Sequence, residues 1–250
     1  MNFQDHFGAV ANTYADHRPG YPPALFEWLA AHSPGRTLAW ESGAGSGQAT
    51  VELARHFDRV LATDASAAQL AEAPPLANVE YRAALAQHSG LAARSVDLAA
   101  VGQALHWFDR PAFYAEVRRV LRPQGLLAAW SYGVLRVEGA AVDACVQQFY
   151  RSVSPYWPAG RAHVDAGYRD LDFPFPVIRA PSFAMSVSWR FAQLLGYARS
   201  WSAVTRCAEA TGEDPVSRLE RDLEHLWEGR DRPRRIEWPL TVLAGCRPEH

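Results

Sequence analysis

The first half of the chain alternates between short apolar runs and segments whose apolar residues recur at helical spacing. Five short apolar runs bounded by turn residues predict strands, at residues 36–41, 59–63, 79–82, 96–101 and 126–131. Apolar residues three and four apart predict helices between them, at residues 47–57, 66–72 and 111–121. This alternation predicts a doubly wound α/β fold whose mostly parallel sheet has helices on both faces and binds its ligand at the carboxyl ends of the strands.

The second half has a different pattern. Amphipathic spacing predicts helices at residues 139–150, 191–206 and 215–227. Residues 181–189 and 236–245 predict two late strands, which bring the expected sheet to seven, and Pro239 marks the last one as edge-like or bulged. We therefore expect a helical insertion around two strands that complete the sheet.

Composition limits the classes of protein to consider. The 250 residues are 48% hydrophobic and 21% charged, which suits one domain with a sizeable core. The formal net charge of −2 predicts no nucleic-acid partner. A polar start without an apolar leader and the lack of an 18-residue apolar run predict neither a signal peptide nor a membrane span. The sequence carries no signal of oligomeric state.

Cysteine, histidine and tryptophan add further limits. Three widely spaced cysteines favour a reduced, cytoplasmic protein over a disulfide framework. The nine histidines lack metal-ligand spacing, so we expect no metal. Nine tryptophans are interpreted mainly as core anchors, with an aromatic pocket for a small organic substrate as the alternative.

The most informative motif is the segment ESGAGSG at residues 41–47. It follows a predicted strand and opens a predicted helix, and its glycines let a ligand lie against the main chain. Gln48 breaks the dinucleotide pattern G-x-G-x-x-G, and no Lys-Ser/Thr pair makes it a phosphate loop. Asp64 ends the next strand, where a nucleotide fold places its ribose-binding acid, although a turn or helix-capping role is the alternative.

These features resemble the class I S-adenosylmethionine-dependent methyltransferases, and within them the type 11 group that includes trans-aconitate methyltransferase-like proteins. The matching segments cover most of the chain: residues 7–23, the glycine loop, residues 61–70, residues 95–109 (SVDLAAVGQALHWFD), residues 113–125 and residues 156–158 (YWP). The resemblance implies a Rossmann-like fold, S-adenosylmethionine as cofactor, S-adenosylhomocysteine as product and a small-molecule methyl acceptor, possibly a carboxylate.

The resemblance also implies roles for individual residues. The loop would hold the methionine part of the cofactor, Asp64 the ribose, and the segments after the third and fourth strands the remainder. The residues so assigned are Glu41, Gly43, Ala44, Gly45, Gly47, Asp64, Ala65, Ala86, Gln87, Gln103 and Ala104. We expect residues 1–35 to form an N-terminal lid and first helix, 36–135 the cofactor-binding core, and 136–250 the substrate-side insertion with the last strands, all in one structural domain.

Four residues are candidates for the acceptor side. Tyr14 and Arg18 lie in the lid-like segment, where the planar guanidinium of Arg18 could pair a carboxylate, although a salt bridge explains it equally well. His106 and Trp107 would face the acceptor, and His106 is the candidate catalytic base with a pKa near neutrality, the alternative being a pocket-wall histidine. Arg161 and His163 are weaker candidates for the edge of this pocket.

Two departures from the family pattern leave two alternatives open. The family usually has Asp where Glu41 stands and an acid where Gln87 stands. A weakened cofactor site would fit a protein that binds S-adenosylmethionine without turnover. The second alternative is an NAD-dependent oxidoreductase on the same fold, against which the G-x-G-x-G spacing and the HWF segment argue.

Overall fold

A computed structural model of the chain describes residues 19–249. Tyr14, Arg18 and the first half of the expected lid lie outside this part. The strands are β1 (Leu38–Ser42), β2 (Arg59–Asp64), β3 (Val79–Ala83), β4 (Val96–Gly102), β5 (Leu121–Tyr132), β6 (Arg136–Val137), β7 (Val177–Ile178), β8 (Phe183–Trp189) and β9 (Arg234–Cys246). The helices are α2 (Pro23–His32), α3 (Gln48–Leu53), α4 (Ala67–Ala71), α5 (Arg110–Val120), α6 (Ala140–Val153), α7 (Arg161–Asp165), α8 (Phe191–Arg199), α9 (Ser202–Thr211) and α10 (Pro215–Glu224), with 3-10 turns η2 (Leu105–Trp107) and η3 (Ser154–Tyr156).

The sheet has the order β3-β2-β1-β4-β5-β9-β6, and β7 and β8 also pair with β9. The first five strands of this order are mutually parallel, and β9 runs antiparallel to every strand it pairs with. The Rossmann-like fold predicted from the sequence is therefore confirmed. Within residues 19–249 the sheet has nine strands, not seven, because the two-residue strands β6 and β7 add to the seven predicted runs, and runs this short leave no periodic signal.

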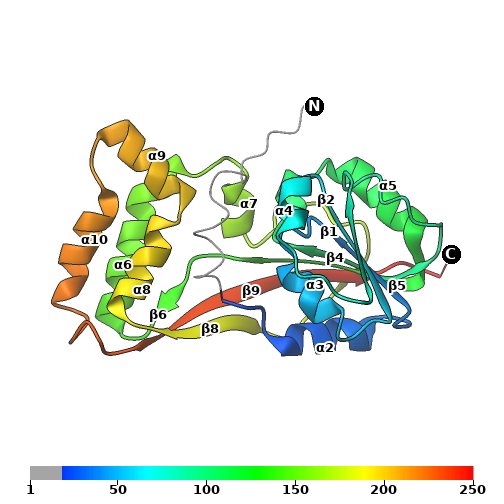
Figure 1. The fold of residues 1–250 in the computed structure, drawn as a ribbon, viewed down its shortest axis with the longest axis horizontal. Coiled ribbons are helices and arrows are strands. Elements are labelled where there is room, and N and C mark those ends of the chain that lie inside the picture. Colours follow the sequence, from blue (N-terminus) through cyan, green and yellow to red (C-terminus); the bar gives the residue numbers. More distant parts are fainter. Residues whose placement is uncertain (1–18, 250) are drawn as a thin grey trace.

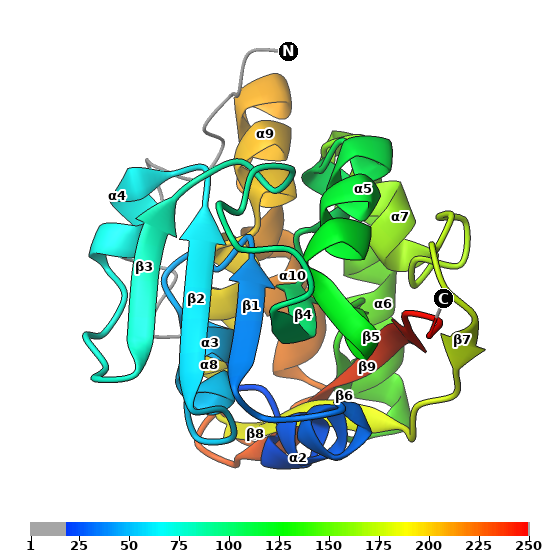
Figure 2. The same ribbon diagram turned by 90° about the vertical axis from the view of Figure 1, so that its right-hand side faces the viewer.

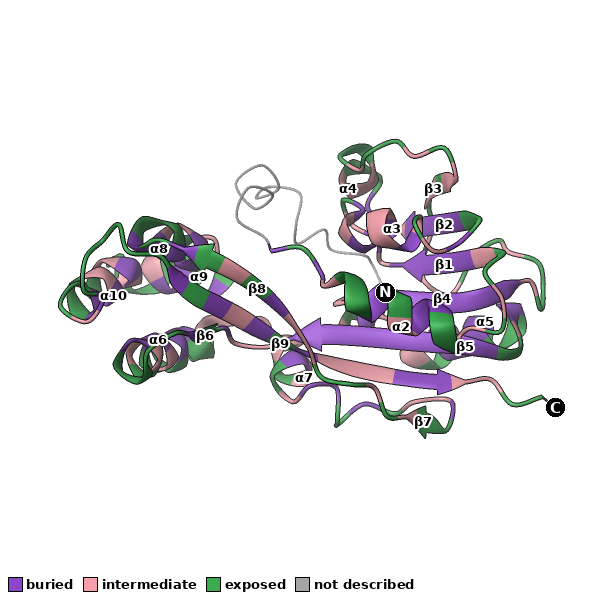
Figure 3. Ribbon diagram, turned by 90° about the horizontal axis from the view of Figure 1, so that it is seen from below, coloured by how far each residue is buried: buried purple, intermediate pink, exposed green. Residues whose placement is uncertain are grey.

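Two apolar layers hold the sheet between helices. On one face, Leu25 and Phe26 of α2 and Leu53 of α3 pack with inward residues of the strands. On the other face, Phe113 and Val117 of α5 pack in a second cluster. The central strands are accordingly buried along most of their length (Figure 3). Figure 2 shows β1, β2 and β3 side by side and parallel, so that their carboxyl ends meet at one edge.

The helical insertion stands at one end of the molecule. Helices α6, α8, α9 and α10 gather there, and the long strands β8 and β9 connect them to the sheet (Figure 1). The sequence predicted one helix over residues 191–206, which is wrong: α8 ends at Arg199 and α9 begins at Ser202. Trp201 interrupts the helix because it takes an extended conformation and packs its buried ring against Phe149, Tyr150 and Tyr197.

Pro239 lies inside β9, which is not an edge strand. On one side Pro239 is paired with Ala184 of β8. On the other side, β9 pairs with β5 from Leu240 onward and with β6 at Ile236 and Glu237, so residues 238–239 fall between the two pairings. A residue without a backbone N–H is tolerated in such an interval because fewer ladder hydrogen bonds are required there.

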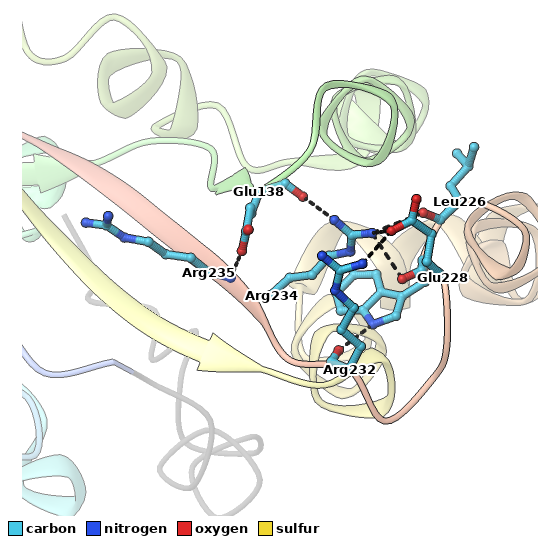
Figure 4. Close-up of polar contacts among 7 residues, drawn as sticks. Glu138, Leu226, Glu228, Arg232, Arg234 and Arg235 are labelled. Carbon is cyan, nitrogen blue, oxygen red and sulfur yellow. Dashed lines mark hydrogen bonds and ion pairs between the residues drawn. The ribbon is translucent and has the colours of Figure 1, made fainter.

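Arg234 ties the insertion to the start of β9. Its guanidinium donates hydrogen bonds to the backbone carbonyls of Glu138, Leu226 and Trp227, and it pairs with the Glu228 carboxylate (Figure 4). The side chain also lies over the Trp227 ring, 5.4 Å from its centroid. These contacts join the segment before α6 and the turn after α10 to one strand. No helix among residues 19–249 is long and apolar enough to cross a membrane.

Candidate active site

The loop between β1 and α3 turns sharply, and its three glycines have positive φ angles, which favour glycine. Gly43, Gly45 and Gly47 have φ of +75°, +56° and +82°. The backbone N–H groups of Gly43 and Ala44 both donate to the carbonyl of Thr63 in β2. A Cβ on Gly43 would stand 2.5 Å from that of Ala104, whereas among residues 19–249 a Cβ on Gly45 would meet only the Gln69 side chain, at 3.7 Å. The loop is therefore closely packed against Ala104 at Gly43, and it is loosely packed at Gly45, where a ligand could approach the main chain.

Asp64 lies at the carboxyl end of β2 and faces this loop. One carboxylate oxygen accepts the backbone N–H of Gly45 and the other that of Ser66, each at 2.8 Å. Ser66 in turn caps α4, because its hydroxyl accepts the backbone N–H of Gln69. Each oxygen keeps a second lone pair, so the half-buried carboxylate can still accept the hydroxyls of a ribose. The turn role and the ligand role weighed from the sequence are therefore compatible.

Glu41 points away from solvent at the end of β1. It is 1% exposed, and the Thr50 hydroxyl of α3 donates a hydrogen bond of 2.5 Å to its Oε2. Burial raises the pKa of this carboxyl to about 8, the Thr50 hydrogen bond opposes the shift, and the charge of Asp64 adds to it. At pH 7 the neutral, protonated form prevails when no cation is near.

The residues at the carboxyl end of β4 lie beside the glycine loop and form the next part of the candidate site. Gln103 adopts a φ of +54°, which is uncommon for a residue with a side chain. Its Oε1 accepts the backbone N–H of Tyr132, so its amide N–H groups remain as the donors it can offer. Ala104 contacts Gly43, which brings β4 against the glycine loop. Ala86 and Gln87 form a turn after β3, and both are partly exposed there, as is Ala65 after β2.

His106 and Trp107 follow on η2. Trp107 is 42% exposed, and both side chains lie against Gly160, which precedes α7. Nδ1 of His106 is 2.9 Å from the hydroxyl of Tyr168, a residue that follows α7. The pKa of His106 is lowered to about 4, chiefly by burial and additionally by the positive charges of Arg161 and His163. This value is below the near-neutral pKa that the sequence suggested, because η2 is covered by the insertion.

Of the two cations that lower the pKa of His106, Arg161 has the larger effect. Its Nε donates to Tyr150 and to Asp165, and its guanidinium lies 4.8 Å from the centroid of the Trp157 ring. The Tyr150 hydroxyl also donates to Asp165. The insertion therefore contributes a cation and an aromatic ring beside η2. Most of the other tryptophans are core anchors, with Trp40, Trp130, Trp227 and Trp238 fully buried.

The structure brings together the sequence candidates of the glycine loop, Asp64, the end of β4 and η2 at the carboxyl edge of the sheet. Sequence reasoning missed Thr50 and Tyr168. Thr50 carried a signal, since it lies on the face of the predicted helix that packs against the strand carrying Glu41. Tyr168 carried none, because it is 62 residues from His106. Residues 19–249 contain no group of three His, Cys, Asp or Glu side chains placed to hold a metal ion.

Known proteins resemble this chain in both sequence and structure. A family model described as a methyltransferase domain matches residues 40–129. A protein of Dictyostelium discoideum named as a methyltransferase is 34% identical over 233 residues, covering 92% of this chain and 89% of the relative. An uncharacterised methyltransferase of Mycobacterium tuberculosis is 36% identical over 130 residues, about half of each chain (48% and 49%).

A solved structure extends the similarity to nearly the whole chain. The structure of a protein from Anaeromyxobacter dehalogenans, assigned as a type II methyltransferase, is 43% identical and superposes with a TM-score of 0.88. The superposition covers 93% of this chain and 99% of the Anaeromyxobacter chain. The similarity therefore includes the insertion as well as the parallel sheet.

Proposed function

Because the chain belongs to the S-adenosylmethionine-dependent methyltransferases, we propose that it transfers a methyl group to a small molecule that presents a carboxylate. The chain matches the relatives from Dictyostelium and Anaeromyxobacter along most of its length, and this match shows the family. All the relatives described above are named as methyltransferases, so the alternative of an NAD-dependent oxidoreductase finds no support. The finer proposal concerns the acceptor and the residues that hold it.

The residues present fit S-adenosylmethionine. The main chain is open above Gly45, and the half-buried Asp64 carboxylate beside it retains acceptor lone pairs for a ribose. In this proposal the loop residues Gly43 to Gly47 hold the methionine part, Asp64 the ribose, and the turn at Ala86 and Gln87 the adenine. Gln103 and Ala104 complete the wall. When bound, the cofactor supplies an electrophilic methyl group on a positively charged sulfonium.

The acceptor class follows from the groups beside η2. A carboxylate is already an anion at pH 7 and needs no base, whereas an amine or a carbon acid does. His106 has a pKa of about 4 and is a weak base, and Arg161 beside it is a cation suited to a carboxylate. The chain's own task is then to hold the acceptor in line and to exclude water. The single observation that carries this proposal is the neutral His106 beside the Arg161 cation.

The cofactor part is tested by thermal unfolding with S-adenosylmethionine, with S-adenosylhomocysteine and with NAD as a control. A ligand at about 100 times its dissociation constant adds about 2.7 kcal/mol of stability. We expect a higher unfolding midpoint with the two adenosyl ligands and none with NAD. The gain should be lost in Asp64→Asn and kept in the matched variant Asp58→Asn, which alters an exposed aspartate just before the opposite end of β2. Stabilisation by NAD alone would contradict the proposal.

The acceptor part is tested by release of S-adenosylhomocysteine in a screen of mono-, di- and tricarboxylates, with trans-aconitate among them, against a matched panel of amines and phenols. Turnover of carboxylates supports the proposal. Turnover of amines alone would contradict it. Binding of S-adenosylmethionine without turnover of any compound would favour the alternative of a cofactor-binding protein that does not catalyse.

A further inference from the structure

Tyr168 has an unusual backbone conformation and hydrogen-bonds to His106. It is 1% exposed and has a φ of +58°, and Gly167 before it has a φ of +61°. A bulky residue in the left-handed region is strained, and such strain persists only where the surrounding structure imposes it. The backbone N–H of Tyr168 donates to the carbonyl of His163, which fixes the turn after α7. The result is a tyrosine hydroxyl 2.9 Å from Nδ1 of His106.

The direction of this hydrogen bond can be worked out from the other neighbours of the hydroxyl. The backbone N–H groups of Leu105 and His106 act as donors toward the Tyr168 oxygen. They compete for the lone pairs of that oxygen, and this favours the arrangement in which the Tyr168 hydroxyl proton faces Nδ1 of His106. A neutral imidazole carries its proton on the nitrogen that is not accepting, which is Nε2.

Burial and the charged surroundings keep the His106 ring neutral. Burial is the main cause that lowers the pKa of His106, and Arg161 and His163, both on α7, add positive charge that also disfavours the imidazolium. Trp107 is the aromatic neighbour on η2, 4.7 Å from the His106 ring between centroids. Among the described residues, Tyr168 is the one whose side chain hydrogen-bonds to the ring, and the ring itself is only partly buried.

We propose that Tyr168 is a positioning residue that fixes His106 as the Nε2–H tautomer, so that the ring offers the methyl acceptor a hydrogen-bond donor and not a base. This inference rests on the proposed function and deepens it. His106, the amide N–H groups of Gln103 and the guanidinium of Arg161 would then all offer hydrogen-bond donors to the methyl-accepting substrate. Donors recognise an oxygen that already carries negative charge, and they leave an uncharged amine without an acceptor for its N–H groups.

The tautomer is measured by long-range ¹H–¹⁵N correlation spectra of the full chain labelled with ¹⁵N-histidine, without cofactor or acceptor. The His106 signals are assigned by their loss in His106→Gln. In the wild type we expect a bare Nδ1 and a protonated Nε2 that stay unchanged from pH 5.5 to 8. In Tyr168→Phe we expect Nδ1 to gain proton occupancy. The matched control Tyr114→Phe removes another buried tyrosine hydroxyl, one that donates to the Asp172 carbonyl, and should leave His106 unchanged.

Two results would overturn the inference. One is a protonated Nδ1 in the wild type, and the other is a His106 that titrates between pH 6 and 7. The wild-type spectrum decides this even where Tyr168→Phe does not fold. The unfolding assay with S-adenosylmethionine is separate, so a protein that fails to bind the cofactor but shows the bare Nδ1 would refute the proposed function and not the tautomer.

Discussion

The hydroxyl of Thr50 donates a 2.5 Å hydrogen bond to the buried carboxyl of Glu41, directly beneath the glycine loop. The family usually has an aspartate at this position, and the additional methylene of Glu41 brings its carboxyl to helix α3. Glu41 has no cationic partner among the described residues, and the carboxylate of Asp64 is the charge that raises its pKa in addition to burial. A carboxyl in this setting is expected to be protonated in the unliganded protein at pH 7.

The first prediction concerns stability against pH. Folding raises the pKa of Glu41 from 4.5 to about 8, so the folded protein binds more protons than the unfolded chain between these values. The free energy of unfolding must then fall as pH rises through this window, by up to about 1.4 kcal/mol per pH unit from this group. Glu41→Gln resembles the protonated form and lacks this loss. Urea unfolding of both proteins from pH 5 to 8 should show the variant gaining stability relative to the wild type, and a constant difference would contradict the prediction.

The second prediction concerns cofactor binding at the same residue. In the proposed site the methionine part of a cationic cofactor lies close to Glu41, and a nearby positive charge lowers the pKa of a carboxyl. Binding of S-adenosylmethionine at pH 7 should therefore release up to one proton. Calorimetric titration in buffers of different ionisation enthalpy measures this number directly. We expect release in the wild type and none in Glu41→Gln, and equal values in the two proteins would exclude Glu41 as the source.

The fold could be predicted from the sequence because its signals are local. The central parallel strands β1, β2 and β4 are short apolar runs, and the loop at Gly43 to Gly47 needs glycine because its glycines have positive φ. The site was only partly predictable, since the partners of its residues come from other elements. Thr50 is nine residues from Glu41, and Tyr168 reaches His106 through a left-handed turn after α7. The break at Trp201 was missed for the same reason, because tertiary packing of its ring overrides helical spacing.

The third prediction separates two glycines of the loop. Alanine at either Gly43 or Gly45 costs roughly 1–2 kcal/mol because both have positive φ. At Gly43 the new Cβ also collides with that of Ala104, at 2.5 Å, whereas at Gly45 it makes an ordinary contact with the Gln69 side chain at 3.7 Å. We expect Gly43→Ala to lower the unfolding midpoint strongly. Gly45→Ala should fold with a smaller loss but bind S-adenosylmethionine at least tenfold more weakly, because its methyl group occupies the face proposed for the ligand.

Thermal unfolding and calorimetric titration of the two variants provide the comparison for the loop. If Gly45→Ala bound the cofactor as tightly as the wild type, the open face above Gly45 would not be the binding surface. If Gly43→Ala were the milder of the two in stability, the close packing of β4 against the loop would not be important for folding.

The fourth prediction concerns the attachment of the insertion to β9 through Arg234. Its side chain is 6% exposed and donates to three backbone carbonyls, so Arg234→Met leaves those acceptors without their donor while keeping an apolar stem over Trp227. Because a buried hydrogen bond to a charged group contributes about 1.5–3 kcal/mol, we expect a loss of about 3 kcal/mol in the free energy of unfolding.

The adjacent Arg235 provides the matched control: its side chain is 66% exposed and pairs with Glu237 on the surface, so Arg235→Met should cost no more than about 0.5 kcal/mol. Hydrogen exchange should localise the difference to α10, whose C-terminal turn loses its contact with the strand. Equal losses in the two variants would mean that the hydrogen bonds of Arg234 only offset the cost of burying its charge. The insertion would then be held by its apolar core alone.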